Sequence, residues 1–136
     1  MNIDQLLGVL RQDPEFMGCV THWHTDPPRP ARFAPWPECV DPSLPPMLEK
    51  RGVRSLYTHQ AQAIQASDRG EDIVVVTPTA SGKTMCYNLP VLSAILKNPN
   101  ARALYLFPTK ALSADQVSEL YELIQLLGVD IKTFTY

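Results

Sequence analysis

The sequence lacks long apolar runs, an excess of charge of either sign, and a dense set of cysteines. No stretch approaches the roughly 18 apolar residues of a membrane-spanning helix. No basic segment followed by an apolar run marks a signal peptide at the N-terminus. The formal net charge of -2 gives no general attraction to nucleic acid, so any such contact has to be local. Three widely spaced cysteines favour free thiols over a disulfide framework, and together these absences predict a soluble, cytoplasmic protein.

The N-terminus carries a helical pattern followed by a histidine-rich segment. Apolar residues recur at helical spacing over residues 2–12, and Asn2 and Gln5 stand at capping-box positions, so we expect a short packing helix. The segment His22-Trp23-His24 fits no common zinc-ligand spacing with the nearby cysteines. An extended segment that buries Trp23 is therefore favoured over a metal site.

Prolines dominate the next part of the chain. Eight of the 20 residues from 27 to 46 are proline, which excludes a helix interior or a central strand. This composition predicts an extended strap, either over the core or as a spacer. Residues 1–42 are thus interpreted as an N-terminal helix with a proline-rich extension, and residues 43–136 as a separate domain.

Residues 43–136 alternate between helical patterns and short apolar runs. Helices are expected over 43–51, 58–69, 83–97 and 111–127, and strands over 73–76, 103–107 and 131–136. Thr58 is expected to cap the second of these helices and Gly128 to end the fourth, whose apolar side includes Leu123 and Ile124. Such alternation predicts an α/β domain with a parallel sheet and right-handed crossovers. The run Ile73 to Val76 is continuously β-branched, as is typical of a strand covered on both faces.

The stretch 72–84 reads DIVVVTPTASGKT and has the order of a strand, a tight loop and a helix start. Backbone N–H groups at such a helix start converge on an anion, and the helix dipole adds positive potential. Lys83 can reach the β- and γ-phosphates of a nucleotide, and the Thr84 hydroxyl can bind Mg²⁺. The strict pattern G-x4-G-K-[ST] has glycine where this chain has Thr77, but the surrounding context agrees. The stretch therefore predicts a nucleoside-triphosphate site.

Three segments together resemble a known family. PTASGKT, with LYTHQ before it and LYLFPTKALSADQ after it, is similar to the first RecA-like domain of superfamily 2 DEAD/DEAH-box helicases. Within that superfamily the similarity is to the bacterial MrfA/YprA-like DNA-repair helicases, and it covers roughly residues 40–136. The resemblance implies a partial RecA-like P-loop NTPase domain with three layers around a parallel sheet.

The resemblance assigns roles to residues in each motif. Gln60, 23 residues before Lys83, corresponds to the glutamine whose amide recognises adenine, and Tyr57 would pack near the base. The nucleotide-binding residues implied are Tyr57, Gln60, Thr79, Ala80, Ser81, Gly82, Lys83 and Thr84. Of these, Lys83 and Thr84 are also implied as catalytic, and Thr84 as the Mg²⁺ ligand. Pro108, Thr109 and Lys110 correspond to the motif that holds the backbone of a single nucleic-acid strand.

Hydrolysis in this family also uses an acidic D-E-x-H or D-E-A-D segment that positions Mg²⁺ and the attacking water. Neither sequence occurs in the 136 residues, and Glu71-Asp72 precedes its apolar run in the wrong order. The resemblance thus implies part of an ATP-dependent helicase, truncated before this motif, whose own ATPase activity is left open. Its implied partners are ATP, Mg²⁺, single-stranded DNA and the C-terminal remainder of the helicase.

Other functions stay open at this point. An RNA helicase shares all three motifs, so RNA is a possible partner. A non-catalytic nucleic-acid-binding module would bind ATP weakly or not at all. A small-molecule kinase would explain the phosphate loop but neither Gln60 nor the segment 108–112. The N-terminal part of a DNA-repair helicase is the leading hypothesis.

Overall fold

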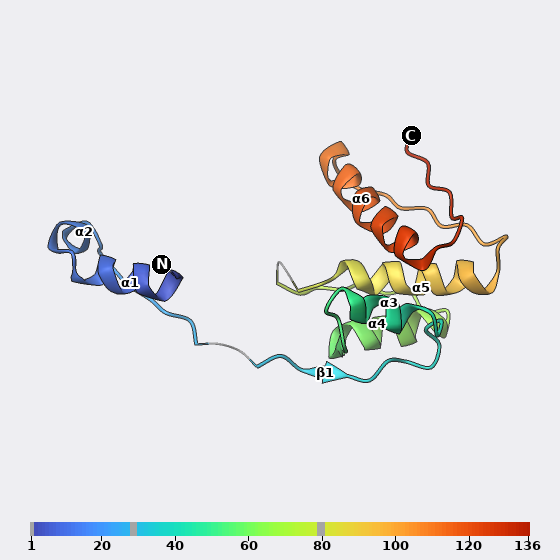
Figure 1. Cartoon of the computed structure of the whole chain (residues 1–136), viewed down its shortest axis with the longest axis horizontal. Coiled ribbons are helices and arrows are strands. Elements are labelled where there is room, and N and C mark those ends of the chain that lie inside the picture. The colour runs from blue at the N-terminus through green and yellow to red at the C-terminus, as the bar shows by residue number, and fades with distance from the viewer. Residues whose placement is uncertain (1, 28–29, 79–80) are drawn as a thin grey trace. The chain divides into compact units, whose positions relative to one another are not determined.

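The computed structural model describes residues 2–27, 30–78 and 81–136. The chain divides into two compact units, Met1–Pro30 and Ala31–Tyr136. Figure 1 follows the chain through both units by colour. Among the described residues, no helix is both long and apolar enough to cross a membrane.

The first unit contains α1 (Ile3–Gln12) and α2 (Pro14–Gly18). The capping box expected at the start of α1 is confirmed. Asn2 Oδ1 accepts a hydrogen bond from the Gln5 amide at 2.9 Å, and Gln5 Oε1 accepts one from the Asn2 amide at 3.0 Å. Asp13 ends α1 and also caps α2, because its carboxylate accepts from two amides of the next turn. The sequence pattern did not predict α2.

The aromatic residues of the segment after α2 contact a guanidinium, a carboxylate and one another. Trp23 is half-buried, and the Arg11 guanidinium lies 4.5 Å from its ring centroid. The rings of His22 and His24 stack at 6.2 Å, and His24 Nε2 lies 3.1 Å from Asp26 Oδ1. In the part of the chain that the structure describes, no three His, Cys, Asp or Glu side chains come together as a metal site.

The second unit packs helices around one hydrophobic core. Its elements are β1 (Phe33–Ala34), α3 (Leu44–Lys50), β2 (Leu56–Tyr57), α4 (Thr58–Asp68), α5 (Thr84–Lys97) and α6 (Lys110–Leu127). The buried core residues are Val40, Leu44, Met47, Leu48, Leu56, Ala61, Ile64, Leu89, Leu92, Leu120, Leu123 and Ile124. They come from all four helices, from β2 and from the strap, so the helices share one core, in which α4 packs on α5.

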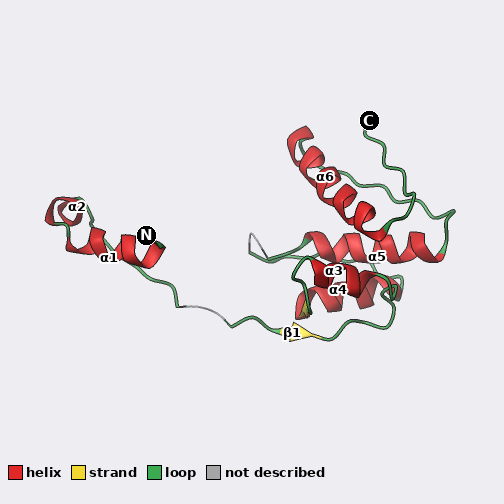
Figure 2. Ribbon diagram, in the orientation of Figure 1, coloured by secondary structure: helices red, strands yellow, loops and turns green. Residues whose placement is uncertain are grey.

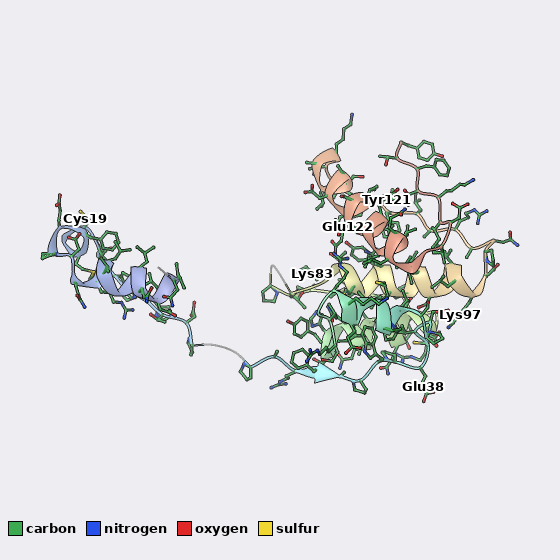
Figure 3. All side chains as sticks on the ribbon, in the orientation of Figure 1. Cys19, Glu38, Lys83, Lys97, Tyr121 and Glu122 are labelled. Carbon is green, nitrogen blue, oxygen red and sulfur yellow. The ribbon has the colours of Figure 1, made fainter. Side chains whose placement is uncertain are left out.

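The end of the proline-rich strap is fastened to α5. Lys97 Nζ donates to the Cys39 carbonyl at 2.7 Å, and Ser93 Oγ accepts from the Asp41 amide at 3.0 Å. Figure 3 labels Lys97 near the C-terminal end of α5. The strap was expected to lie either over the core or as a spacer. Residues 39–41 lie over the core.

The expected parallel sheet is not confirmed. The segments 73–76, 103–107 and 131–136 have no strand pairing, and the sheet found among the described residues is the antiparallel pair β1–β2. Figure 2 shows the last two of these segments as loops. Exposure alternates along 104–107: Tyr105 is half-buried and packs against the core, whereas Leu104 is 83% exposed. With burial on one face only, these segments lack the two-sided cover that a continuous apolar strand needs.

The helix boundaries agree with the sequence pattern to within one residue at each end. The residue preceding α4 is Tyr57, with an extended backbone, whereas Thr58 was expected to cap it. α5 begins at Thr84, one residue later than expected. α6 ends as expected at Gly128, whose φ of 67° is the left-handed conformation that glycine adopts without strain.

The buried and exposed leucines permit a matched test of this fold. Leu89→Ala removes a fully buried side chain of α5 and should lower the free energy of unfolding by about 2–5 kcal/mol. Leu104→Ala, at a side chain that is 83% exposed, should change it by no more than about 0.5 kcal/mol. Urea unfolding monitored by circular dichroism measures both changes. A large loss for Leu104→Ala would show that its segment is covered on both faces.

Candidate nucleotide-binding site

The phosphate loop ends in a left-handed glycine that leads directly into α5. Gly82 has φ of 72°, Lys83 already has helical dihedral angles, and Thr84 is the first helical residue. Of the residues expected in this loop, Thr79 and Ala80 lie outside the described part of the chain. The remaining residues of the motif, Ser81 to Thr84, lie where the loop passes into α5.

Lys83 is folded back onto its own loop. Its Nζ donates to the Thr77 carbonyl at 2.9 Å and to the Pro78 carbonyl at 2.7 Å. The same Nζ lies 3.2 Å from Thr77 Oγ1 and 3.4 Å from Ser81 Oγ, and the Thr77 and Ser81 hydroxyls are 2.5 Å apart. Loop oxygens thus surround the ammonium group where phosphate oxygens would be expected. Figure 3 labels Lys83 at the start of α5.

Gln60 connects α4 to this loop. Its side chain is 3% exposed, its Nε2 donates to the Gly82 carbonyl at 2.9 Å, and its Oε1 accepts from the Tyr57 amide at 2.8 Å. A Cβ added at Gly82 would lie 2.6 Å from Gln60 Nε2, so the contact also depends on the glycine. The expected proximity of Gln60 to the phosphate loop is confirmed. The contact itself, to the backbone, was not foreseen.

Three rings stack beside the start of α4, and of these only Tyr57 was expected at the site. Tyr57 lies between Phe33 and His59, stacked at centroid distances of 5.3 Å and 5.8 Å. His59 Nε2 lies 3.1 Å from the Ser81 carbonyl oxygen. Nothing in the sequence pattern singles out Phe33, which is far from the motif along the chain. His59 stands next to Gln60, and that adjacency was the one available signal.

A cavity of about 370 Å³ lies next to Lys83, which forms part of its lining. It is lined by Ser67, Ile73, Val75, Lys83, Cys86, Tyr87, Pro90 and Val91. Burial raises the pKa of the Cys86 thiol, although the Lys83 charge acts in the opposite direction. The lining is mostly apolar and the thiol stays protonated at neutral pH, so this cavity does not suit a phosphate group.

A magnesium ion bound with a nucleotide needs few protein ligands. Thr84 is half-buried at the first turn of α5, where its hydroxyl can supply one oxygen. Mg²⁺ in such sites keeps several waters and binds mainly to phosphate oxygens. A single hydroxyl therefore fits a magnesium ion that arrives with the nucleotide.

The second motif, Pro108 to Lys110, forms the capped start of α6. Thr109 is the N-cap, and its Oγ1 accepts from the Leu112 amide at 3.2 Å. Pro108, Thr109 and Lys110 are all exposed. The hydroxyl keeps its own hydrogen to donate, and Lys110 adds a positive charge beside free helix amides.

A polar contact ties this segment to α5. Tyr105, which is half-buried and precedes the motif, donates from its Oη to the buried Asn88 Oδ1 at 3.0 Å. The Tyr105 ring lies edge-on to Tyr87 at 5.8 Å, and Tyr87 Oη donates to Gln116 Oε1 of α6. Burial, and to a lesser extent Tyr87, raises the pKa of Tyr105 to about 12. The helix that follows the phosphate loop is thus joined to both sides of the Pro108 to Lys110 motif.

Comparison with known proteins gives consistent matches. The DEAD/DEAH box helicase family matches residues 57–136. The uncharacterized ATP-dependent helicase YprA of Bacillus subtilis (strain 168) is 57% identical over 117 residues, 86% of this chain and 16% of YprA. The ATP-dependent DNA helicase Hel308 of Pyrococcus horikoshii is 34% identical over 99 residues, 71% of this chain and 14% of Hel308. The DUF1998 helicase MrfA, in a crystal structure with DNA and AMPPNP, superposes with a TM-score of 0.86 at 51% identity, over 100% of this chain and 19% of MrfA. The chain thus spans less than a fifth of the length of these relatives.

The Tyr105–Asn88 contact predicts a specific pH dependence. The unfolded chain loses the Tyr105 proton near pH 10 and the folded chain near pH 12, so the wild-type free energy of unfolding should fall across that interval. Tyr105→Phe should lower this free energy by about 1–3 kcal/mol at pH 7, because buried Asn88 Oδ1 loses its donor. The difference from wild type should then shrink as the pH rises.

Urea unfolding at pH 7 and across the alkaline range measures this difference. Tyr136→Phe, at an exposed tyrosine, is the control and should stay parallel to wild type throughout. A Tyr105→Phe difference that is constant with pH would contradict the assignment of the raised pKa.

Proposed function

The chain belongs to the DEAD/DEAH box helicase family, and from that membership we propose that it carries the ATP-binding segment of an ATP-dependent DNA helicase of the DNA-repair type. The family match and the superposition on MrfA support a RecA-like helicase-domain fold. The resemblance to YprA and MrfA expected from the three motifs is confirmed. The observation that carries the proposal is the hydrogen bond from Gln60 to the Gly82 carbonyl, because it joins two motifs 22 residues apart.

In the proposed complex, ATP phosphates replace the loop oxygens around Lys83. The ammonium exchanges the Thr77 and Pro78 carbonyls for phosphate oxygens, which make shorter and stronger charge-assisted bonds. The amides of Gly82, Lys83 and Thr84 lie before or in the first turn of α5, where they have no intrahelical acceptor and can bind the phosphates. Thr84 would hold Mg²⁺ together with those phosphates.

Gln60 keeps enough hydrogen-bonding capacity to recognise adenine. Its Nε2 has a second hydrogen, and its Oε1 has a second lone pair, beyond the bonds to Gly82 and Tyr57. The free hydrogen can be donated to adenine N7 and the free lone pair can accept from the exocyclic amine. Guanine presents an oxygen at that second position, so the same amide would discriminate against it. Tyr57 is proposed to pack near the base.

Pro108, Thr109 and Lys110 are proposed to hold the backbone of a single DNA strand. The support is the exposed helix start with its hydroxyl and lysine, and the crystal structure of MrfA bound to DNA. Contacts of this kind go to phosphate and carry no sequence information. RNA has the same phosphate groups, so an RNA of the same sequence serves as the alternative ligand in the binding test.

We further propose that segments 73–76, 103–107 and 131–136 are the strands of a RecA-like parallel sheet in the complete helicase. The alternation of half-buried and exposed side chains along 104–107 has the period of a strand. The superposition on MrfA over the whole chain supports this arrangement. Residues 1–30 are proposed to be a separate part of that protein, whereas residues 31–42 of the predicted extension belong to the second unit.

Nucleotide titration tests the proposed ATP site. Lys83→Ala should weaken ATP binding about ten- to a hundredfold, since it removes a charged hydrogen-bond donor to phosphate. Gln60→Ala should weaken ATP much more than GTP, because it removes the contact to the adenine amine. Gln125→Ala, at an exposed glutamine of α6, is the control. Fluorescent ATP and GTP analogues measure the affinities, and equal losses of ATP and GTP in Gln60→Ala would argue against base recognition.

Oligonucleotide binding tests the second motif. Lys110→Ala should weaken the binding of single-stranded DNA of any sequence and reduce the slope of log affinity against log salt by about 0.7, the contribution of one phosphate contact. Lys132→Ala removes an exposed lysine elsewhere and should leave both quantities unchanged. Fluorescence anisotropy with DNA and RNA of the same sequence gives the values. Tighter binding of RNA than of DNA would favour an RNA helicase.

A further inference from the structure

His59 and Gln60 hold two consecutive carbonyl groups of the phosphate loop. His59 Nε2 lies 3.1 Å from the Ser81 oxygen, and Gln60 Nε2 donates to the Gly82 oxygen at 2.9 Å. A carbonyl oxygen can only accept, so the imidazole must carry a hydrogen on Nε2 and donate it. Two adjacent residues of the first turn of α4 thus bind two adjacent peptide groups of the loop.

These two contacts determine where the loop amides point. The peptide bonds among the described residues are trans, so each carbonyl and the N–H of its own peptide group point in opposite directions. Holding the Ser81 carbonyl toward α4 turns the Gly82 N–H away from α4. Holding the Gly82 carbonyl does the same for the Lys83 N–H. The left-handed φ of 72° at Gly82 lets the chain satisfy both contacts.

The surroundings of His59 restrict the orientation of its ring. The imidazole is half-buried and stacks on Tyr57 with an interplanar angle of 10°. Tyr57 in turn stacks on Phe33 of β1 with an angle of 18°. A ring held on one face in this way has few orientations available, so its donor stays directed at the Ser81 oxygen.

We propose that His59 is a positioning residue of the phosphate loop, which orients the Gly82 amide toward the nucleotide phosphates through its bond to the Ser81 carbonyl. This inference rests on the proposed ATP site and adds a division of labour within it. Gln60 contacts the base and also holds the Gly82 carbonyl, whereas His59 acts on the phosphates through the backbone alone. Loss of the His59 donor therefore weakens every nucleotide that carries the phosphates, whatever its base.

Three variants separate the donor from the ring. His59→Phe keeps a ring that can stack on Tyr57 but removes the donor, His59→Gln keeps a donor without the ring, and His22→Phe removes an exposed imidazole elsewhere. In the 136-residue chain, His59→Phe should weaken ATP and GTP by the same factor, about two- to tenfold, as expected for one hydrogen bond. His59→Gln should recover most of the affinity, and His22→Phe should match wild type.

The carbonyl ¹³C chemical shift of Ser81, measured without nucleotide, gives a second readout that does not require binding. It should move in His59→Phe and return toward the wild-type value in His59→Gln. Wild-type affinity for ATP in His59→Phe, an unchanged Ser81 shift, or a loss confined to ATP would each overturn the inference. A wild-type chain that binds no ATP would instead refute the proposed function and, with it, the role of His59 toward phosphate.

Discussion

The buried carboxamide of Gln60 is the contact on which the arrangement of the nucleotide site depends. A carboxamide inside a protein must have partners for both its oxygen and its nitrogen, because an unpaired buried polar group costs about 1–3 kcal/mol. Gln60 meets this requirement with the Tyr57 amide on one side and the Gly82 carbonyl on the other. This side chain therefore ties the start of α4 to the end of the phosphate loop and the start of α5, and the contact of His59 with the Ser81 carbonyl reinforces it.

The local features of this fold could be predicted because they depend on neighbouring residues. The capping box of α1 and the glycine at the end of α6 were read correctly from the sequence, since both are satisfied within one turn of helix. The apolar positions of α6 are likewise correct, with Leu123 and Ile124 in the core. The parallel sheet could not be predicted from neighbouring residues alone. A β-branched run has the same composition whether or not a neighbouring strand and a covering layer are present.

The site was predictable to the same extent. The order strand, loop and helix start indicated Gly82 and Lys83, and the spacing to Gln60 indicated its proximity. The contact from His59 to Ser81 depends on how α4 lies against α5, which no pattern within either segment specifies. Phe33 joins the site through the β1–β2 pairing, a contact between residues distant in sequence. The roles assigned to individual residues are predictions about the binding of nucleotide and nucleic acid.

In the proposed nucleotide site, the folded-back lysine makes phosphate binding an exchange reaction. Lys83 already has carbonyl and hydroxyl oxygens around its ammonium, so an incoming phosphate competes with acceptors that belong to the protein itself. The measured affinity is then the difference between two hydrogen-bonded states and understates the strength of the lysine–phosphate contact. Side-chain rotamers interconvert within nanoseconds where they are not tightly packed, far faster than a protein meets its ligand. The internal competitor therefore lowers the equilibrium constant and leaves the association rate largely untouched.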